Sequence, residues 1–321
     1  MAQLRIITLE EHYAAPPYTR GRGGAFGSDF ARSVAERISD VTRFRLPEMD
    51  AAGIGLQVLS LPNPGVQGEA DPATAIRHAK QTNDALAQLC ADHPGRFAAF
   101  AALPCQDPER AAEELERCVT GLGFVGALVN GHTNGVYLDD PRFEVLWERL
   151  ESLGVPLYLH PTFPPETPAV LAGHPGLAGP AWGWGVETAS HALRLVSGGV
   201  FDRHPGAVLV LGHMGEGLPF ALDRLDDRWA VLQHERPLRH APSHYVRSNM
   251  YITTAGAESP HALRCALAAM GPERVLFSVD YPFQSAASAT AFLAAAELDP
   301  AEREALSHGN AARLLRLPTA P

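Results

Sequence analysis

Leu9-Glu10-Glu11-His12 ends the first apolar run of the chain, which covers Arg5 to Leu9. In an extended strand, side chains two residues apart point to the same side, so Glu10 and His12 project together while Glu11 points away. A carboxylate and an imidazole that converge at a strand end are typical ligands of a divalent metal. Three later apolar runs also end in a metal-ligand or acid/base residue: His160, His213 and Asp280.

The arrangement of the apolar runs predicts the fold. Eight short runs with little period-2 alternation indicate strands buried on both faces, as in parallel sheets: residues 5–9, 56–61, 96–103, 125–129, 155–160, 207–213, 251–254 and 274–280. Amphipathic segments separate them, including 30–52, and most of these segments begin at an Asp-Pro or Ser-Pro pair, a common helix start. We predict a (β/α)8 TIM barrel in one domain, residues 1–321. A doubly wound open sheet is the alternative, but no G-x-G-x-x-G follows the first strand.

Composition excludes several classes of function. The chain has 321 residues, 46% hydrophobic and 19% charged, which is ordinary for a globular protein. A net charge of -10 without a Lys/Arg cluster argues against a nucleic-acid surface. No run approaches membrane-spanning length. The four cysteines form no C-x-x-C pair, and Cys118 falls on an apolar helix face, so we expect a reducing, cytoplasmic compartment.

In a barrel, the polar residues that end these strands would all lie at the same end of the fold. Active sites in this fold lie at the C-terminal ends of the strands. A single histidine at a strand end is more often a hydrogen-bonded cap than a ligand. Five ligand or acid/base residues at strand ends of one barrel instead predict a metal site: Glu10, His12, His160, His213 and Asp280.

Two long segments have open roles. Residues 19–28 are Gly-rich around Phe26, which suits either a surface loop or an active-site flap. Residues 161–186 contain Trp182 and Trp184 among many Pro and Gly residues. They suit either a wall against an aromatic substrate or a subunit contact. Asn130, after the fourth strand, is either a turn residue or a substrate donor.

Longer motifs resemble a known family, the amidohydrolase-related decarboxylases. Within that family, the likeness is to the γ-resorcylate (2,6-dihydroxybenzoate) decarboxylases, and it extends over nearly the whole chain. The most specific matches are Leu9 to His12, Tyr158 to Pro161, Leu211 to Gly217 and Ser278 to Phe283. The resemblance implies a metal-dependent barrel that removes CO2 from hydroxybenzoates without oxidation or organic cofactor, as a homotetramer or homodimer.

The resemblance also implies roles for individual residues. The metal ligands would be Glu10, His12, His160 and Asp280. His213 would be a second acid/base group oriented by Glu216, and Arg224 would contact the substrate. Phe26 and Phe283 would lie beside the substrate ring. Tyr281 replaces a common Trp of the family, and residues 132–137 form a shorter segment than usual, so the sequence predicts the reaction better than the substrate.

The chemistry of decarboxylation matches these residue types. Protonation of the carboxyl-bearing carbon lets the ring expel CO2 and regain aromaticity, so a nearby acid is needed, and we expect Asp280 to supply the proton. Negative charge from the substrate and from Glu10 is expected to raise the pKa of Asp280. Two nitrogen and two oxygen donors suit Zn2+ or Mn2+. The alternatives are a metal-dependent hydrolase of a lactone or amide, which the Glu-x-His pair and the missing bridging lysine disfavour, and a non-catalytic metal-binding protein.

Overall fold

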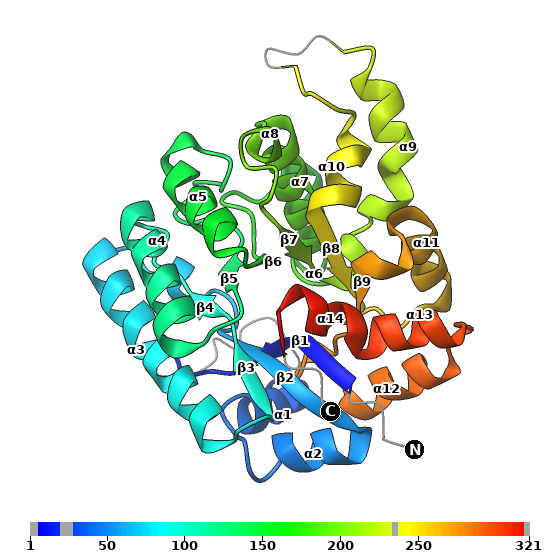
Figure 1. Cartoon of the computed structure of the whole chain (residues 1–321). Coiled ribbons are helices and arrows are strands. Elements are labelled where there is room, and N and C mark those ends of the chain that lie inside the picture. Colours follow the sequence, from blue (N-terminus) through cyan, green and yellow to red (C-terminus); the bar gives the residue numbers. More distant parts are fainter. Residues whose placement is uncertain (1–5, 20–27, 233–236, 318–321) are drawn as a thin grey trace.

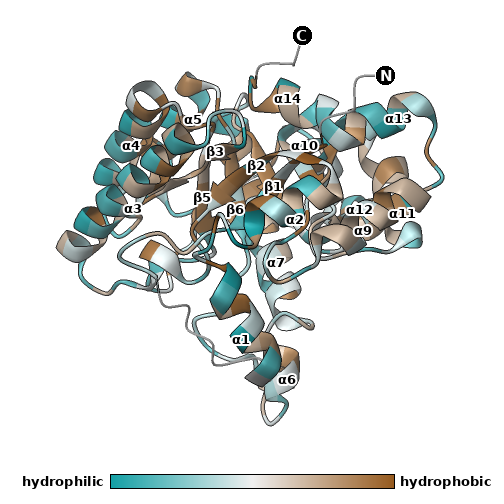
Figure 2. Cartoon of the chain, turned by 90° about the horizontal axis from the view of Figure 1, so that it is seen from below, coloured by the Kyte–Doolittle hydropathy of each residue, from teal (hydrophilic) through white to brown (hydrophobic). Residues whose placement is uncertain are grey.

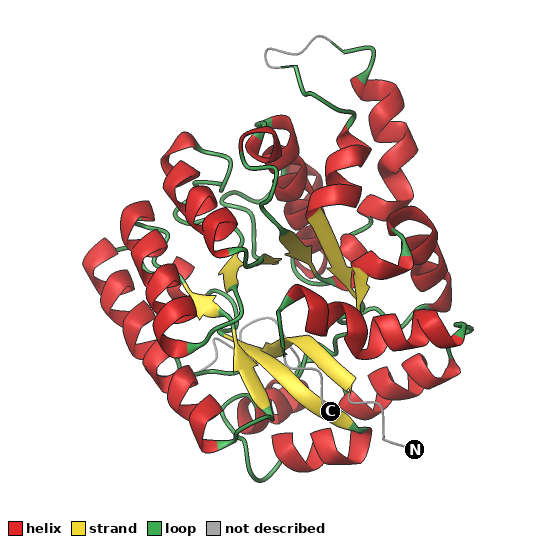
Figure 3. Ribbon diagram, in the orientation of Figure 1, coloured by secondary structure: helices red, strands yellow, loops and turns green. Residues whose placement is uncertain are grey.

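The computed structural model describes residues 6–19, 28–232 and 237–317. Its strands form a parallel barrel surrounded by helices (Figure 1), as Figure 3 shows in the same orientation. The strands are β1 Ile6–His12, β2 Ile54–Ser60, β3 Phe97–Ala99, β4 Ala101–Ala102, β5 Ala127–Asn130, β6 Leu157–His160, β7 Leu209–Leu211, β8 Met250–Thr253 and β9 Val275–Leu276. β3 and β4 are consecutive segments of a single barrel strand that is interrupted at Phe100. The nine described strands therefore fill eight strand positions of the barrel.

Helices follow the strands along the chain. They are α1 Ser28–Arg37, α2 Arg45–Ala52, α3 Pro72–Asp92, α4 Pro108–Glu116, α5 Glu144–Leu153, α6 Pro175–Ala178, α7 Gly183–Ser197, α8 Val200–Arg203, α9 Leu218–Trp229, α10 Pro242–Asn249, α11 Pro260–Met270, α12 Ala286–Ala295, α13 Pro300–Glu304 and α14 Asn310–Leu314. The expected helix starts are confirmed where Asp71, Asp107 and Ser259 accept a backbone N–H bond as N-caps. Within the described ranges, no helix has the length and apolarity to cross a bilayer.

Hydrogen bonds outside the regular ladders close the barrel. The strands pair in two sheets, one from β1 to β3 and one from β4 to β9. The Phe100 N–H donates to the Leu59 carbonyl at 3.0 Å and joins these two sheets. At the other junction the Asp280 N–H donates to the Glu10 carbonyl at 3.0 Å, and the His12 N–H donates to the Tyr281 carbonyl at 2.7 Å. The (β/α)8 prediction is therefore confirmed, and this junction sets β1 beside the segment after β9.

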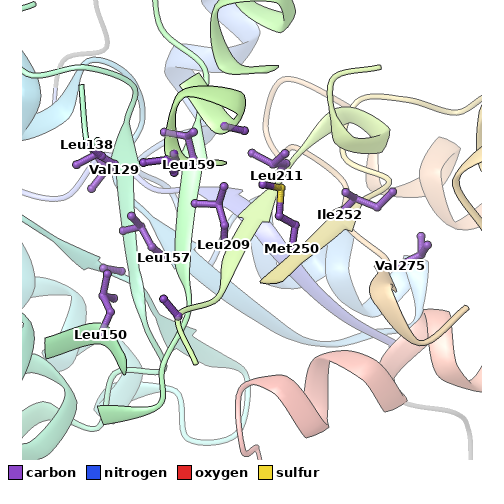
Figure 4. Close-up of a cluster of buried hydrophobic side chains, with 14 of the residues drawn as sticks. Val129, Leu138, Leu150, Leu157, Leu159, Leu209, Leu211, Met250, Ile252 and Val275 are labelled. Carbon is purple, nitrogen blue, oxygen red and sulfur yellow. The ribbon is translucent and has the colours of Figure 1, made fainter. Parts of the chain in front are cut away.

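Alternate residues of each strand pack into two cores. Leu157, Leu159 and their equivalents on the neighbouring strands pack outward against the helices (Figure 4). Tyr158 and its equivalents fill the barrel interior, where α14 residues pack against them. Figure 2 shows α14 at one end of the molecule and α1 and α6 at the opposite end.

Some predicted element boundaries are wrong. Residues 30–52 form α1 and α2 rather than one helix, because the Asp40 side chain accepts the Phe44 N–H at 2.6 Å and the chain turns there. β7 and β9 end at Leu211 and Leu276, earlier than expected. His213 and Asp280 therefore lie in the segments that follow the strands, both with positive φ.

Candidate metal centre

Four of the predicted side chains meet at one end of the barrel. Donor atoms of Glu10, His12, His160 and Asp280 all lie within 4.8 Å of one another, and we call these four residues the donor cluster. The first three are buried, and the Asp280 side chain is 14% exposed. Residues far apart in sequence thus contribute two carboxylates and two imidazoles to a small volume.

A β-bulge in β1 directs two of these donors. Ile7 and Leu9 pack in the barrel interior, so strict alternation would direct Glu10 and His12 outward. The β1–β2 register shifts between Thr8 and Glu11, which adds a residue to β1. Because a bulge changes which side the following residues face, Glu10 and His12 join the donor cluster instead.

The Glu10 carboxylate is fixed from inside the barrel. The Tyr158 hydroxyl donates to Glu10 Oε2 and lies 3.0 Å from Thr253 Oγ1. A Cβ on Gly212 would lie 2.5 Å from the same Glu10 oxygen, so a larger residue at this position would displace the carboxylate. Glu10 Oε2 is thereby occupied by protein contacts, and Oε1 faces the other donors.

Unpaired buried atoms indicate that the donor cluster fits a cation. Within the described part of the chain, Glu10 Oε1 and His12 Nε2 are buried without a hydrogen-bond partner. His12 Nε2 lies 3.1 Å from Asp280 Oδ1, but without hydrogen-bond geometry. Burial lowers the pKa of His160 well below its usual value, which keeps this imidazole neutral. Such orphaned donors are costly unless a bound ion pairs with them.

His213 lies at the edge of the donor cluster in a strained segment. Its Nε2 is 3.7 Å from Glu10 Oε1 and 3.9 Å from Asp280 Oδ2. Its Nδ1 is 2.8 Å from Glu216 Oε1, the partner that the sequence predicts. His213, Met214 and Glu216 all have positive φ, a strain common at functional sites. Burial would lower the pKa of His213, but Glu216 and Glu10 raise it well above its usual value.

Asp280 completes the donor cluster from a residue with φ of +77°. Burial would raise the pKa of Asp280, but His12 and His213 together lower it to about 2. The two imidazoles thus outweigh the effect of burial, and the expected rise in this pKa would require the added negative charge of a substrate.

A buried polar network behind β1 was not predicted. Glu11 points away from the donor cluster, as expected, and accepts hydrogen bonds from the Val279 N–H at 3.0 Å and from Gln57 Nε2 at 3.1 Å. Arg45, also fully buried, donates to Gln57 Oε1 at 3.0 Å and to the His12 carbonyl. Burial raises the pKa of Glu11 to about 8. The network ties β1, β2 and the segment after β9 together directly behind the donors.

A cavity of about 530 Å³ opens beside the donor cluster. His160, His213 and Asp280 line one part of it. Aromatic rings line the cavity as well: Phe283 stands edge-on to His12 at 5.5 Å, and Trp184 stands edge-on to Phe163 at 5.3 Å. The donors therefore face a pocket with the size and apolar walls of a small-molecule site.

The remaining predicted residues differ in position. Phe283 lines the cavity. Phe26 lies outside the described residues. Arg224 is exposed on α9 and does not line the cavity within this chain. Of the two tryptophans in the long segment, Trp184 lines the cavity and Trp182 is 62% exposed. Asn130 contacts Gln67 and Leu61 instead of the cavity.

A parallel barrel with such a donor cluster at its strand ends defines an amidohydrolase-like protein. The chain matches the family model described as Amidohydrolase over residues 25–317 and belongs to that family. It is 42% identical over 320 residues to the gamma-resorcylate decarboxylase of Rhizobium sp. (strain MTP-10005), covering 97% of this chain and 98% of the relative.

Solved structures agree with this assignment. A crystal structure of 2,6-dihydroxybenzoate decarboxylase complexed with 2,6-dihydroxybenzoate is 42% identical, with a TM-score of 0.94, covering 98% of this chain and 99% of that chain. A dihydroxybenzoic acid decarboxylase from Polaromonas sp. JS666, with bound manganese and the inhibitor 2-nitroresorcinol, is 40% identical, with a TM-score of 0.94, covering 98% of each chain.

Proposed function

We propose that this protein is a metal-dependent, non-oxidative decarboxylase of an ortho-hydroxybenzoate, acting reversibly and without an organic cofactor. The observation that carries the proposal is the donor cluster facing an aromatic-lined cavity in an amidohydrolase barrel. Relatives named gamma-resorcylate decarboxylase, 42% identical over nearly the full chain, support 2,6-dihydroxybenzoate as the first substrate to test. Salicylate and 2,3-dihydroxybenzoate are the other members of this substrate class.

We propose Glu10, His12, His160 and Asp280 as the ligands of one Mn2+ or Zn2+ ion. Two nitrogen and two oxygen donors suit either metal, and the manganese in the Polaromonas structure supports Mn2+. When bound, the ion would supply Lewis acidity that polarises the substrate oxygens and lowers the pKa of the substrate hydroxyl.

The proton movements are assigned to Asp280 and His213. Asp280 is ionised at rest, so it accepts the proton of the substrate hydroxyl and then delivers it to the carbon that carries the carboxylate. The carbon–carbon bond then breaks, its electron pair restores the aromatic ring, and CO2 leaves. His213 returns a proton to the product phenolate and is recharged by water. Glu216 keeps the imidazole oriented through the 2.8 Å contact to Nδ1.

A hydrolase on the same barrel has less support. Metal-bound hydroxide would attack a lactone or amide there, yet the named relatives with high identity are decarboxylases. A non-catalytic metal-binding role would not require the His213–Glu216 pair, which we assign to proton transfer.

We also propose that this single-domain chain assembles as a homotetramer or homodimer, as the family resemblance implies. Exposed apolar side chains on and after α9 support a subunit contact: Phe220 is 89%, Val231 68% and Leu232 60% exposed. Light scattering after size-exclusion chromatography tests this. Arg224, exposed on the same helix, remains a predicted substrate contact.

One experiment tests the reaction. Metal-depleted protein is reconstituted with Mn2+ or Zn2+ and incubated with 2,6-dihydroxybenzoate, 2,3-dihydroxybenzoate and salicylate, while CO2 release is measured. We expect metal-dependent CO2 release from at least one of them. Hydrolysis of a lactone or amide panel with no CO2 from any hydroxybenzoate would contradict the proposal.

A further inference from the structure

Two of the proposed ligands lie on segments that no regular ladder joins. His12 ends β1, and Asp280 follows the end of β9 at Leu276 by four residues. Within the described ranges, β1 pairs in its sheet only with β2, and β9 only with β8. Asp280 also has a positive φ, a conformation that a residue other than glycine keeps only when its surroundings impose it. Contacts outside the sheets must therefore set the position of Asp280 relative to His12.

Both backbone polar groups of His12 are bound. Its N–H donates to the Tyr281 carbonyl at 2.7 Å, and its carbonyl accepts a hydrogen bond from Arg45 Nη2. The guanidinium carbon of Arg45 also lies 4.4 Å from the centre of the Tyr281 ring. Arg45 thus contacts one proposed ligand and the residue that follows another.

Glu11 holds the segment that leads into Asp280. Its Oε1 accepts hydrogen bonds from the Val279 N–H at 3.0 Å and from the Ser278 hydroxyl at 3.2 Å. Gln57 donates from Nε2 to the other carboxylate oxygen at 3.1 Å and accepts from Arg45 Nη1 at 3.0 Å. The contacts close on themselves, and we call the residues that they join the tether ring: His12, Arg45, Gln57, Glu11, Val279, Asp280 and Tyr281.

The polar side chains of the tether ring are withdrawn from water. Glu11, Gln57 and Arg45 are each 0% exposed. Charged side chains are rarely buried so completely, and well-packed apolar residues often stabilise a fold at least as well as a buried ion pair does. A fully bonded polar network does, however, fix one arrangement of the segments that it joins. Position, more than stability, accounts for these charges.

Building on the proposed metal site, we propose that Glu11, Gln57 and Arg45 are positioning residues that set the separation of His12 and Asp280 through the tether ring. In the described part of the chain, none of the three belongs to the donor cluster or lines the cavity. The separation that they control is the 3.1 Å between His12 Nε2 and Asp280 Oδ1. A shift of either segment would change this separation and weaken both metal binding and proton transfer by Asp280.

Exchanging the acid and the amide of the tether ring tests this inference. Glu11→Gln places an amide NH2 against Gln57 Nε2, so two donors face each other. Contacts behind metal ligands typically change metal affinity by about 10–100-fold, and we expect the Mn2+ affinity of Glu11→Gln, titrated from the metal-depleted protein, to fall about tenfold. The double variant Glu11→Gln/Gln57→Glu restores every hydrogen bond, with the bond between the two side chains reversed, and should recover most of this loss. Wild-type affinity in the single variant, or no recovery in the double variant, overturns the inference.

The EPR spectrum of bound Mn2+ reports the geometry of its ligands. The splitting should change in Glu11→Gln and return towards that of the wild type in the double variant. Asn249→Asp is the control, because this buried amide donates to the Pro205 and Ala207 carbonyls at the opposite end of the barrel, where β8 begins. It should lower the free energy of unfolding without changing Mn2+ affinity or the spectrum. Equal changes in the control would mean that the tether ring acts only through general stability, and would overturn the inference.

CO2 release at saturating Mn2+ separates this inference from the proposed reaction. If Mn2+ affinities follow the expected order but no hydroxybenzoate releases CO2, the decarboxylase proposal fails and the tether ring stands. If the wild type releases CO2 and every variant binds Mn2+ as it does, the tether ring fails and the reaction stands. Gln57→Met interrupts the ring without opposing two donors and replaces Glu11→Gln should that variant not fold. Its Mn2+ affinity should also fall, and an unchanged value overturns the inference.

Discussion

The Tyr158 hydroxyl donates a hydrogen bond to Oε2 of Glu10 inside the barrel, where both side chains are fully buried. The two residues come from β6 and β1, on different sides of the barrel. The contact leaves Oε1 of the carboxylate directed at the other donors. Tyr158 thus positions a proposed ligand without being one itself.

Removing this hydroxyl should weaken metal binding. In Tyr158→Phe the Glu10 carboxylate loses its orienting donor, and outer-shell contacts of this kind typically change metal affinity by about 10–100-fold. We expect Mn2+ affinity, measured by titration of metal-depleted protein, to fall about tenfold.

Tyr245→Phe is the matched control, because Tyr245 also donates to a carboxylate, that of Asp202, away from the donor cluster. It should keep wild-type metal affinity. Equal losses in both variants would mean that Tyr158 acts only through general stability.

The donor cluster could be predicted because its members end apolar runs, and the C-terminal ends of barrel strands converge. Two of the proposed ligand positions, His160 and Asp280, follow from this rule alone. The bulge in β1 could not be predicted, since Ile7, Leu9 and Glu10 show a simple apolar-to-polar change in sequence. The contacts that fix this part of β1 come from distant sequence: Ser278 Oγ accepts the N–H bonds of Leu9 and Glu10.

The network behind β1 could not be predicted for a similar reason. Arg45 and Gln57 are separated from Glu11 by tens of residues, and an arginine in an amphipathic helix is normally exposed. Burial of Arg45 becomes favourable only when the His12 carbonyl and Gln57 are already in position. A tertiary contact therefore overrides the local preference.

Arg45 should be important for stability. Arg45→Met removes the cation from a buried network and leaves Glu11 and the His12 carbonyl without its support, which should cost about 3 kcal/mol of unfolding free energy. Arg142→Met is the control, because its ion pair with Asp140 is largely exposed and should contribute less than about 1 kcal/mol. Urea unfolding of the metal-depleted proteins measures both. A loss for Arg45→Met no larger than for the control would contradict this role.

His191 should make the fold sensitive to acid. Its buried Nε2 accepts the Leu138 N–H at 3.0 Å, and burial lowers the pKa of His191 to about 3. Between pH 6.5 and 3 the unfolded chain binds a proton that the folded chain does not, so stability falls as the pH falls, by at most about 1.4 kcal/mol per pH unit. His191→Gln keeps an acceptor but does not titrate. Its unfolding free energy should change less between pH 7 and 5 than that of the wild type, and parallel curves would contradict the prediction.

Asp280 has two proposed roles that one substitution separates. Asp280→Asn keeps an oxygen donor beside His12 but removes the group that accepts and delivers a proton. We expect weakened but measurable metal binding and a loss of turnover of about 10²–10⁴-fold, the usual contribution of a general acid or base. Mass spectrometry of the metal content tests the role of Asp280 as a ligand, and CO2 release by the same sample tests its role in proton transfer. If the variant holds metal and retains full activity, another group carries the proton, and His213, whose Nε2 lies 3.9 Å from Asp280 Oδ2, becomes the first residue to test. If the variant loses metal entirely, its activity is measured again at saturating Mn2+. Turnover would then recover if Asp280 is needed only for metal binding, and would stay low if Asp280 also transfers the proton.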